Sequence, residues 1–349
     1  MNPFAYERPR TLSDATAMAA EDGAMVYAGG TTMLDLMKLG VYRPRRVVDV
    51  TALDAPEMRA VTVDGDALRL GALVTMHDAA ENAEVKGRAP VLSESLWLAA
   101  TQQLRHMATL GGNVMQRTRD TYFRHPDWLD LAPDPDGGAA SEVATYGNTP
   151  YGDGRLTAVR QPTRLSAVLG TTEDDTASYP GDFAQGLVAF DTVVEIAGPD
   201  GPREMAFTDL HIRPADRAHE GEYARLNPGE IITAFRVPLT PALQRSIYIK
   251  ARDRESYAFA NASAAVGLEM DGDTVADARI GLGGVATVPW RSSEAEEALR
   301  GQALTPDAMQ QAAEAAFADA VTHEATAFKV PLGRNVIVHA LTTLQRLEG

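Results

Sequence analysis

Two glycine segments decide how this sequence is interpreted: Tyr27-Ala28-Gly29-Gly30-Thr31-Thr32 and Thr109-Leu110-Gly111-Gly112-Asn113. Paired glycines leave successive backbone N–H groups unobstructed by a Cβ, and the neighbouring threonine hydroxyls add donors for phosphate oxygens. In the second segment, Asn113 adds a side-chain amide. One such segment is explained equally well by a tight turn without a ligand. Two of them favour a long anionic ligand such as a dinucleotide.

Neither segment has the spacing of the common nucleotide-binding fingerprints. No Gly-Lys-Ser/Thr follows, and neither contains G-x-G-x-x-G, which disfavours a P-loop or a Rossmann site. A third segment, Gly281-Leu282-Gly283-Gly284-Val285-Ala286, does fit the permissive form G-x-G-x-x-A. That fingerprint requires a helix to begin there, whereas Pro289 and Trp290 follow within a few residues. We therefore expect the third segment to bind no phosphate.

The sequence offers no metal-ligand set and no covalent nucleophile. His323-Glu324 lacks the second histidine of a zincin helix, and Asp134-Pro135-Asp136-Gly137 does not fit the register of a calcium loop. No Gly-x-Ser-x-Gly elbow occurs. From chemistry alone, the charged stretch at residues 250–257 indicates a solvated strand end or turn, although Lys250 could direct its cation toward a cofactor. No residue is assigned as a catalytic acid or base.

Composition is that of an ordinary globular chain. Its 349 residues, 45% hydrophobic and 23% charged, suffice for two or three domains. The formal net charge of −16 disfavours nucleic acid as a partner. Because cysteine is absent, redox chemistry would need a bound organic cofactor. No secretory signal or apolar run of membrane-spanning length is found, so we expect the cytoplasm, or the periplasm only by export with a partner.

Hydrophobic periodicity in the first part of the chain indicates an α+β arrangement. Ser13 is expected to cap a helix, which is followed by a strand over 24–28, a helix from Met33 and a strand over 46–50, a βαβ-like unit. Alternating strands follow over 57–75.

Residues 125–163 are rich in Asp, Gly, Pro and Thr and are expected to form a long irregular surface loop. A helix over 93–105 is expected to lead into the second glycine segment. The remaining expected elements are a helix over 183–190, a hairpin strand over 192–196, strands over 230–237, 245–252, 260–270 and 275–284, and helices over 306–320 and 333–347.

In this order and context, the glycine segments resemble the FAD-binding subunits of molybdenum hydroxylases of the xanthine dehydrogenase and aldehyde oxidoreductase type. The resemblance covers nearly the whole chain. It is carried by Pro3-Phe4-Ala5-Tyr6, Ala28-Gly29-Gly30-Thr31, Met107-Ala108-Thr109-Leu110-Gly111-Gly112-Asn113, Gln116-Arg117-Thr118-Arg119, Tyr122-Phe123-Arg124, and Gly281 to Ala286 before Pro289-Trp290-Arg291.

The resemblance implies an α+β fold in two parts. Residues 1–225 would form a FAD-binding domain of the vanillyl-alcohol-oxidase (PCMH-like) type, with α+β subdomains at about 1–55 and 56–225. Residues 226–349 would form a small α+β C-terminal domain of the CO dehydrogenase flavoprotein type. FAD would lie between these parts.

The resemblance also assigns cofactor contacts to positions in this sequence. The first segment would line the diphosphate, and the second would form the other side of the cradle. Asp182 would hold the cofactor through ribose hydroxyls, Ile232 would pack near the adenine, and Lys250 would lie close to the flavin. The complete expected set is Val26, Tyr27, Ala28, Gly29, Gly30, Thr31, Thr32, Met33, Thr109, Gly111, Gly112, Asn113, Gln116, Asp182, Ile232 and Lys250.

One departure from the pattern concerns an iron–sulfur cluster. In aldehyde oxidoreductase relatives, a cysteine follows Arg-Thr-Arg and the next loop supplies three more, which hold a [4Fe-4S] cluster. Here Asp120 follows Arg119, and the chain has no cysteine. A thiolate-bound [4Fe-4S] cluster in this chain is therefore excluded.

The resemblance implies an oxidoreductase subunit that transfers electrons within a heterotrimer. Its FAD would receive electrons from the [2Fe-2S] clusters of a small subunit, while a large subunit with a molybdenum cofactor would oxidise an aldehyde or N-heterocycle. The acceptor would be oxygen, a quinone or NAD. The alternative is a free-standing FAD-dependent oxidase or dehydrogenase that acts directly on a small alcohol or aldehyde. A scaffold that has lost its cofactor is a third hypothesis.

Overall fold

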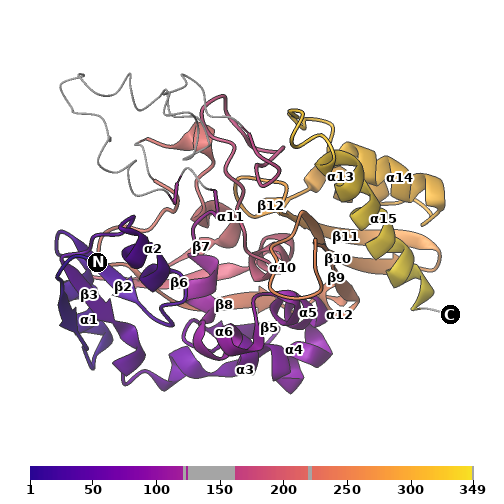
Figure 1. Cartoon of the computed structure of the whole chain (residues 1–349). Helices are drawn as coiled ribbons and strands as arrows, with labels where there is room; N and C mark the ends of the chain where they lie inside the picture. The colour runs from indigo at the N-terminus through magenta and orange to yellow at the C-terminus, as the bar shows by residue number, and fades with distance from the viewer. Residues whose placement is uncertain (121–122, 125–161, 219–221, 348–349) are drawn as a thin grey trace.

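The computed structural model describes residues 1–120, 123–124, 162–218 and 222–347, and the architecture is drawn in Figure 1. In this part of the chain, the strands form sheets of three, five and four strands with helices packed against them. The mixed helix and sheet content confirms the predicted α+β class. Most of the predicted irregular loop, residues 125–161, lies outside the described residues.

The first subdomain is a small parallel sheet. Its elements are β1 (Ala5–Glu7), α1 (Leu12–Ala19), β2 (Ala24–Tyr27), α2 (Met33–Leu39) and β3 (Arg46–Asp49), with strand order β1-β3-β2. Parallel neighbours need a crossover, and α2 supplies it between β2 and β3, as the predicted βαβ unit requires. The predicted cap at Ser13 is wrong. Thr11 caps α1 by accepting a hydrogen bond from the Asp14 backbone N–H, so Ser13 lies inside the helix.

The second subdomain is built on an antiparallel sheet with the order β4-β5-β8-β6-β7. Helices pack against it (Figure 1), and they bring the backbone at Met107, just before the second glycine segment, against Gly29 of the first subdomain. Its strands are β4 (Val61–Asp64), β5 (Ala67–Gly71), β6 (Val193–Gly198), β7 (Gly201–Ala206) and β8 (Ile231–Pro238). Its helices are α3 (Met76–Glu81), α4 (Ala83–Arg88), α5 (Pro90–Leu98), α6 (Gln102–Met107), α7 (Leu110–Val114), α10 (Phe183–Ala189) and α11 (Phe207–Leu210), with 3-10 turns at Pro56–Arg59 and Pro214–Asp216. A further 3-10 turn, at Val50–Ala52, follows β3 at the end of the first subdomain.

The single helix predicted over 93–105 is two helices, α5 and α6. The break falls at Ala100, which has φ of +50°, a conformation incompatible with a right-handed helix. Thr101 then restarts the chain as a helix, because its hydroxyl accepts the backbone N–H of Leu104. This break turns α6 so that it ends directly before the second glycine segment.

Strand β8 bears on the domain boundary. It pairs with β5 on one side and β6 on the other, so it lies at the centre of the second subdomain's sheet. The expected boundary at residues 225 and 226 precedes β8, whereas the C-terminal sheet begins at Ser246. We therefore propose that the domains divide between Pro238 and Ser246.

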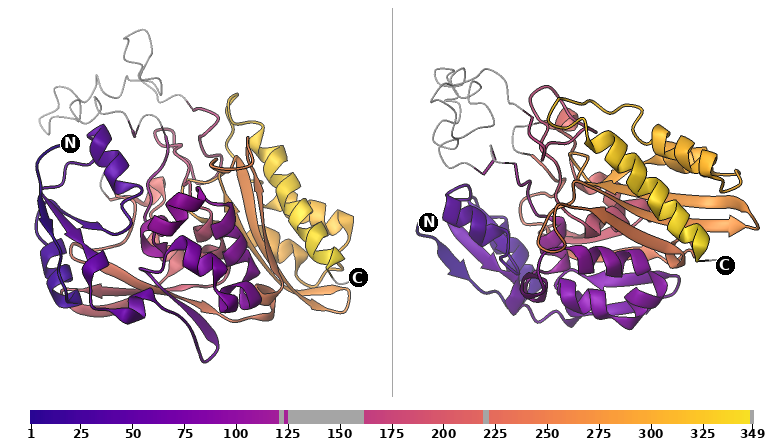
Figure 2. Two further views of the ribbon diagram at one scale, coloured as in Figure 1. Left: turned by 60° about the horizontal axis from the view of Figure 1, so that its bottom comes forward. Right: turned by 45° about the vertical axis from the view of Figure 1, so that its right-hand side comes forward.

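The C-terminal part is an antiparallel sheet of order β12-β11-β10-β9 with helices on both faces. One face packs against α13, α14 and α15 around a core of its own, and the other packs against α5 and α10 of the preceding part (Figure 2). The elements are α12 (Pro241–Gln244), β9 (Ser246–Ala251), β10 (Ala262–Asp271), β11 (Thr274–Gly283), β12 (Trp290–Arg291), α13 (Ser293–Leu299), α14 (Pro306–Ala315) and α15 (Lys329–Arg346). Helix α13 was not expected from the sequence.

The third glycine segment serves packing. Gly281 and Gly283 lie in β11, and no helix begins there. A Cβ at Gly281 would stand 2.2 Å from the carbonyl oxygen of Gln185, so glycine allows α10 to approach the strand. The Gly284 carbonyl accepts a hydrogen bond of 2.6 Å from the buried Lys329 amine. No helix begins at this segment, as Pro289 and Trp290 led us to expect.

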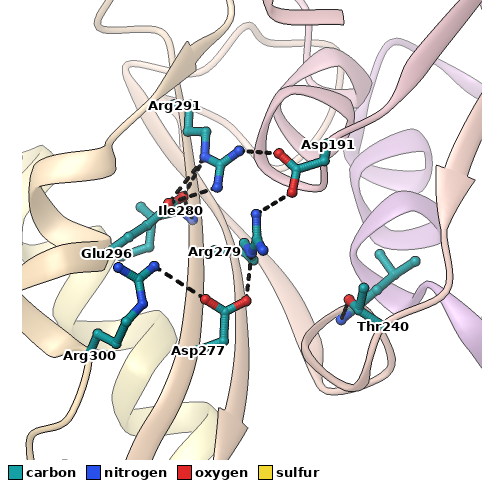
Figure 3. Close-up of polar contacts among 9 residues, drawn as sticks. Asp191, Thr240, Asp277, Arg279, Ile280, Arg291, Glu296 and Arg300 are labelled. Carbon is teal, nitrogen blue, oxygen red and sulfur yellow. Dashed lines mark hydrogen bonds and ion pairs between the residues drawn. The ribbon is translucent and has the colours of Figure 1, made fainter. Parts of the chain in front are cut away.

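An ion-pair network joins α10 to the C-terminal sheet (Figure 3). Asp191, just after α10, accepts from both Arg279 of β11 and Arg291 of β12. Arg291 also pairs at 3.0 Å with Glu296 of α13, whose pKa is raised by burial. Arg279 pairs with Asp277 at 2.7 Å. The network ties the two parts of the chain together on the side of β11 and β12.

No helix among the described residues is long and apolar enough to cross a membrane.

Candidate functional site

Both predicted glycine segments line one cavity of about 320 Å³. It lies where the first subdomain meets the helices and β8 of the second. A volume of this size is typical of a small-molecule site. The lining residues are Ala24, Met25, Val26, Ala28, Gly29, Gly30, Thr31, Thr32, Met33, Tyr42, Val50, Ala72, Thr109, Gly111, Gly112, Met115, Tyr223, Leu226, Glu230, Ile231 and Ile232.

Gly29 is where the two segments touch. A Cβ built on Gly29 would lie 2.1 Å from the carbonyl oxygen of Met107 and 2.9 Å from the Cα of Ala108. Real Cβ contacts are never that short, so any other residue would push the segments apart. Glycine at this position therefore allows the loop after β2 to pack against the backbone that precedes α7.

The first segment keeps its backbone donors available. Gly30 has φ of +71°, a left-handed conformation that favours glycine. Among the described residues, none accepts a hydrogen bond from the backbone N–H of Gly29, Gly30 or Thr31. The Thr31 hydroxyl likewise has no partner within the described part of the chain. The segment therefore presents unpaired donors beside the cavity.

The second segment uses its donors within the protein. Thr109 caps α7, and its hydroxyl accepts the Gly112 N–H at 3.2 Å. The Gly111 N–H donates to the Ala72 carbonyl at 2.9 Å, and the Asn113 N–H donates to the Thr109 carbonyl at 2.8 Å. The glycines here form one turn of helix. This segment therefore shapes the wall of the cavity without offering the N–H groups that its sequence suggests.

Asn113 contributes an unsatisfied acceptor. Its amide nitrogen contacts the Met76 sulfur at 3.4 Å, while its Oδ1 is buried and makes no hydrogen bond in the structure. A buried acceptor without a donor is costly, so a hydroxyl or N–H from a ligand would stabilise it. Tyr27, Asn113 and Gln116 are not among the residues that line the cavity.

Two buried side chains hold the end of the second segment. The carbonyl of Val114 accepts from the Tyr179 hydroxyl at 2.8 Å and from His211 Nε2 at 3.1 Å. Burial lowers the pKa of His211 to about 4, so the ring is neutral at pH 7 and donates through Nε2. No local pattern in the sequence indicates these contacts, because Val114, Tyr179 and His211 are far apart in the chain.

Asp182 and Lys250 form a buried pair. Their side chains are 5% and 1% exposed, and Lys250 Nζ lies 2.8 Å from Asp182 Oδ2. The Lys250 amine also donates to the Leu98 carbonyl at 3.0 Å, and Tyr248 donates to Asp182 Oδ1 at 2.7 Å. Burial raises the pKa of the Asp182 carboxyl, and the interactions with Lys250 and Tyr248 oppose this rise. Neither Asp182 nor Lys250 lines the described cavity.

Part of the cavity lining is apolar. Ile232, implied by the family resemblance, lines the cavity together with Ile231 and Leu226. Glu230 also lines it, and its carboxylate is neutralised by Arg203 at 2.7 Å. The lining therefore combines unpaired N–H donors that suit an anion with apolar side chains that suit a flat ring. Within the described residues, no group of three His, Asp or Glu side chains could hold a metal ion.

Sequence comparisons agree with this geometry. Residues 2–240 match the family model of the FAD binding domain in molybdopterin dehydrogenase. Residues 247–343 match that of the CO dehydrogenase flavoprotein C-terminal domain. The aldehyde oxidoreductase FAD-binding subunit PaoB of Escherichia coli (strain K12) is 35% identical over 343 residues, which are 98% of each chain.

More distant relatives share the same architecture. The carbon monoxide dehydrogenase medium chain of Afipia carboxidovorans is 27% identical over 326 residues, 93% of this chain and 88% of that one. A chain in the crystal structure of cyanide-inactivated Cu,Mo-CO dehydrogenase superposes with a TM-score of 0.72 at 23% identity, with 99% of both chains covered. This last likeness shows the fold.

Proposed function

We propose a function for this chain, which belongs to the family of FAD-binding subunits of molybdenum hydroxylases. It is an oxidoreductase subunit whose cofactor is FAD. It passes electrons from [2Fe-2S] clusters of a small partner subunit to an external acceptor, while a large partner subunit oxidises the substrate at a molybdenum cofactor. We propose an aldehyde or N-heterocycle as that substrate and oxygen, a quinone or NAD as the acceptor.

The observation that carries this proposal is the single cavity shared by both glycine segments. The residues present fit FAD: unpaired N–H groups at Gly29 to Thr31 suit its diphosphate, and the orphaned Asn113 oxygen suits one of its hydroxyl groups. Ile231, Ile232 and Leu226 offer an apolar surface for the adenine.

When FAD is bound, its isoalloxazine supplies the redox chemistry, and the protein supplies binding, orientation and electrostatics. The first segment donates hydrogen bonds to the anionic part of the cofactor. Tyr179 and His211 fix Val114, directly after the second segment, and so help to keep that part of the cavity wall in place.

We also propose that Asp182 and Lys250 contact the cofactor. They differ from the other proposed contacts because they already form a buried ion pair with each other. Their charges already neutralise each other, and Tyr248 completes the carboxylate's hydrogen bonds. A ribose hydroxyl or the flavin would therefore approach two groups whose charges are already paired, and it would share the hydrogen bonds that they already make. The pair would orient the cofactor without adding net charge.

The test is to purify the protein from its host with its partners attached, and to record the visible spectrum and metal content. The proposal predicts bound flavin together with molybdenum and iron in the recovered complex. Flavin without molybdenum or iron would overturn it. Turnover of a small alcohol or aldehyde by the isolated chain would instead favour a free-standing oxidase.

A further inference from the structure

Arg117 lies next to the cavity and has not been assigned a role. Its guanidinium stands 3.9 Å from the centre of the Tyr223 ring and 4.5 Å from that of Phe123, so it is held between two aromatic faces. Tyr223 lines the cavity, and so does Tyr42. Stacking of this kind fixes a guanidinium plane and leaves the N–H groups at its edge able to donate hydrogen bonds, one of them to Tyr42.

The charge of Arg117 also acts on the hydroxyl of Tyr42. Burial raises the pKa of Tyr42 well above its usual value, Tyr223 adds to the rise, and Arg117 opposes it. Arg117 therefore acts on two residues of the cavity wall at once. Its positive charge therefore lies beside two residues that line the same cavity as the glycine segments.

Charge balance distinguishes Arg117 from the other arginines nearby. Arg124 and Arg119 both pair with Asp35, the latter at 3.8 Å, and Arg203 pairs with Glu230. Within the described ranges, no carboxylate pairs with Arg117, although the chain as a whole carries a formal net charge of −16. A half-buried cation without a carboxylate partner is stabilised when an anionic ligand binds beside it.

We propose that Arg117 binds the diphosphate of FAD, an inference that rests on the proposed function. The diphosphate is the part of FAD that is ionised at pH 7, and a guanidinium matches phosphate oxygens in charge and geometry. The donors of Gly29 to Thr31 then act on the same group as Arg117. Tyr223 and Phe123 hold the cation ready, which reduces the ordering that binding requires.

The experiment measures FAD binding to the full chain after its flavin has been removed, using the quenching of flavin fluorescence at several salt concentrations. Arg117→Gln should weaken FAD binding by about tenfold to a hundredfold, the usual worth of a hydrogen bond to a charged group. Its affinity should also depend less on salt than that of the wild type, because one screened attraction is gone. Arg117→Lys should restore most of the salt dependence.

Arg213→Gln is the matched control. Arg213 also stacks on an aromatic ring, Trp290 at 4.6 Å, but that ring, unlike Tyr223, does not line the cavity. It should change neither FAD affinity nor its salt dependence. ADP should displace FAD from the wild type better than adenosine does, and this preference should shrink in Arg117→Gln.

Two results would contradict the proposal, and they can be told apart from failure of the function itself. If Arg117→Gln weakens FAD but keeps the wild-type salt dependence and ADP preference, Arg117 only supports the aromatic stack. If its affinity equals that of the wild type, Arg117 does not touch the cofactor. If the wild type takes up no FAD at all, the proposed function fails as well.

Discussion

The two glycine segments look alike in sequence and differ in what they do. The first leaves the N–H groups of Gly29, Gly30 and Thr31 unpaired beside the cavity, and it needs Gly29 for its contact with Met107. The second uses its N–H groups in the first turn of α7 and against Ala72. A glycine pair near a ligand can therefore serve either to bind the ligand or to shape the wall of its site, and the hydrogen-bond partners of its N–H groups decide which.

The largest effect is expected from Gly29→Ala. The new Cβ would meet backbone at 2.1 Å, so the segments must separate. Overpacking of this kind costs up to about 3 kcal/mol of unfolding free energy, and a similar loss in binding would be roughly a hundredfold in FAD affinity. Urea denaturation and flavin titration measure the two.

Gly87→Ala is the control for this prediction. Gly87 lies in α4 with open space around it, so the alanine should stabilise the helix by up to about 1 kcal/mol and leave FAD binding unchanged. Wild-type FAD affinity in Gly29→Ala would show that the segments do not need to touch.

The second effect is a pH dependence of the unfolding free energy, which arises from His211, the residue that holds Val114 beside the second segment. The folded pKa of His211 is about 4, below the ordinary value of 6.5. Between these values the unfolded chain binds more protons, so stability falls as pH falls, by about 2 kcal/mol between pH 7 and pH 5.

His211→Gln should remove this part of the pH dependence, and the measurement is the unfolding free energy at pH 7 and at pH 5. His323→Gln, at an exposed histidine, should retain it. Equal pH dependence in both variants would show that His211 titrates in the folded protein as it does in the unfolded chain.

The smallest effects are expected from replacing one threonine in each segment, and they separate a role in stability from a role in FAD binding. Thr109→Val removes the cap of α7 and should cost about 1 kcal/mol of stability with little change in FAD affinity. Thr31→Val should do the reverse, because its hydroxyl has no partner in the described structure and is available to the cofactor. Thermal unfolding and flavin titration of both variants test this crossed pattern, and the same response in both would refute it.

Much of this fold follows from local patterns in the sequence. The βαβ unit, the strands β9, β10 and β11, and the helices α14 and α15 lie within a few residues of their predicted positions, because alternation and helical periodicity are local properties. The central place of β8 was missed, since strand order depends on contacts between distant residues.

Part of the cavity lining was predictable from the sequence, whereas the interactions of these residues were less so. Both glycine segments and Ile232 do line one cavity. Glycine pairs are poor helix formers, so propensity favours a loop at Gly111 and Gly112, and only packing against Ala72 and the Thr109 cap makes a helix there. The mutual pairing of Asp182 and Lys250, and the stack around Arg117, depend on distant contacts.

The most direct test of the account is amide hydrogen exchange of the full chain with and without FAD, read at the two segments. We predict that FAD strongly slows exchange at Gly29, Gly30 and Thr31, whose N–H groups are unpaired without it. Exchange at Gly111, Gly112 and Asn113 should already be slow and should change little. Protection that appears at the second segment while the first stays unchanged would contradict the account.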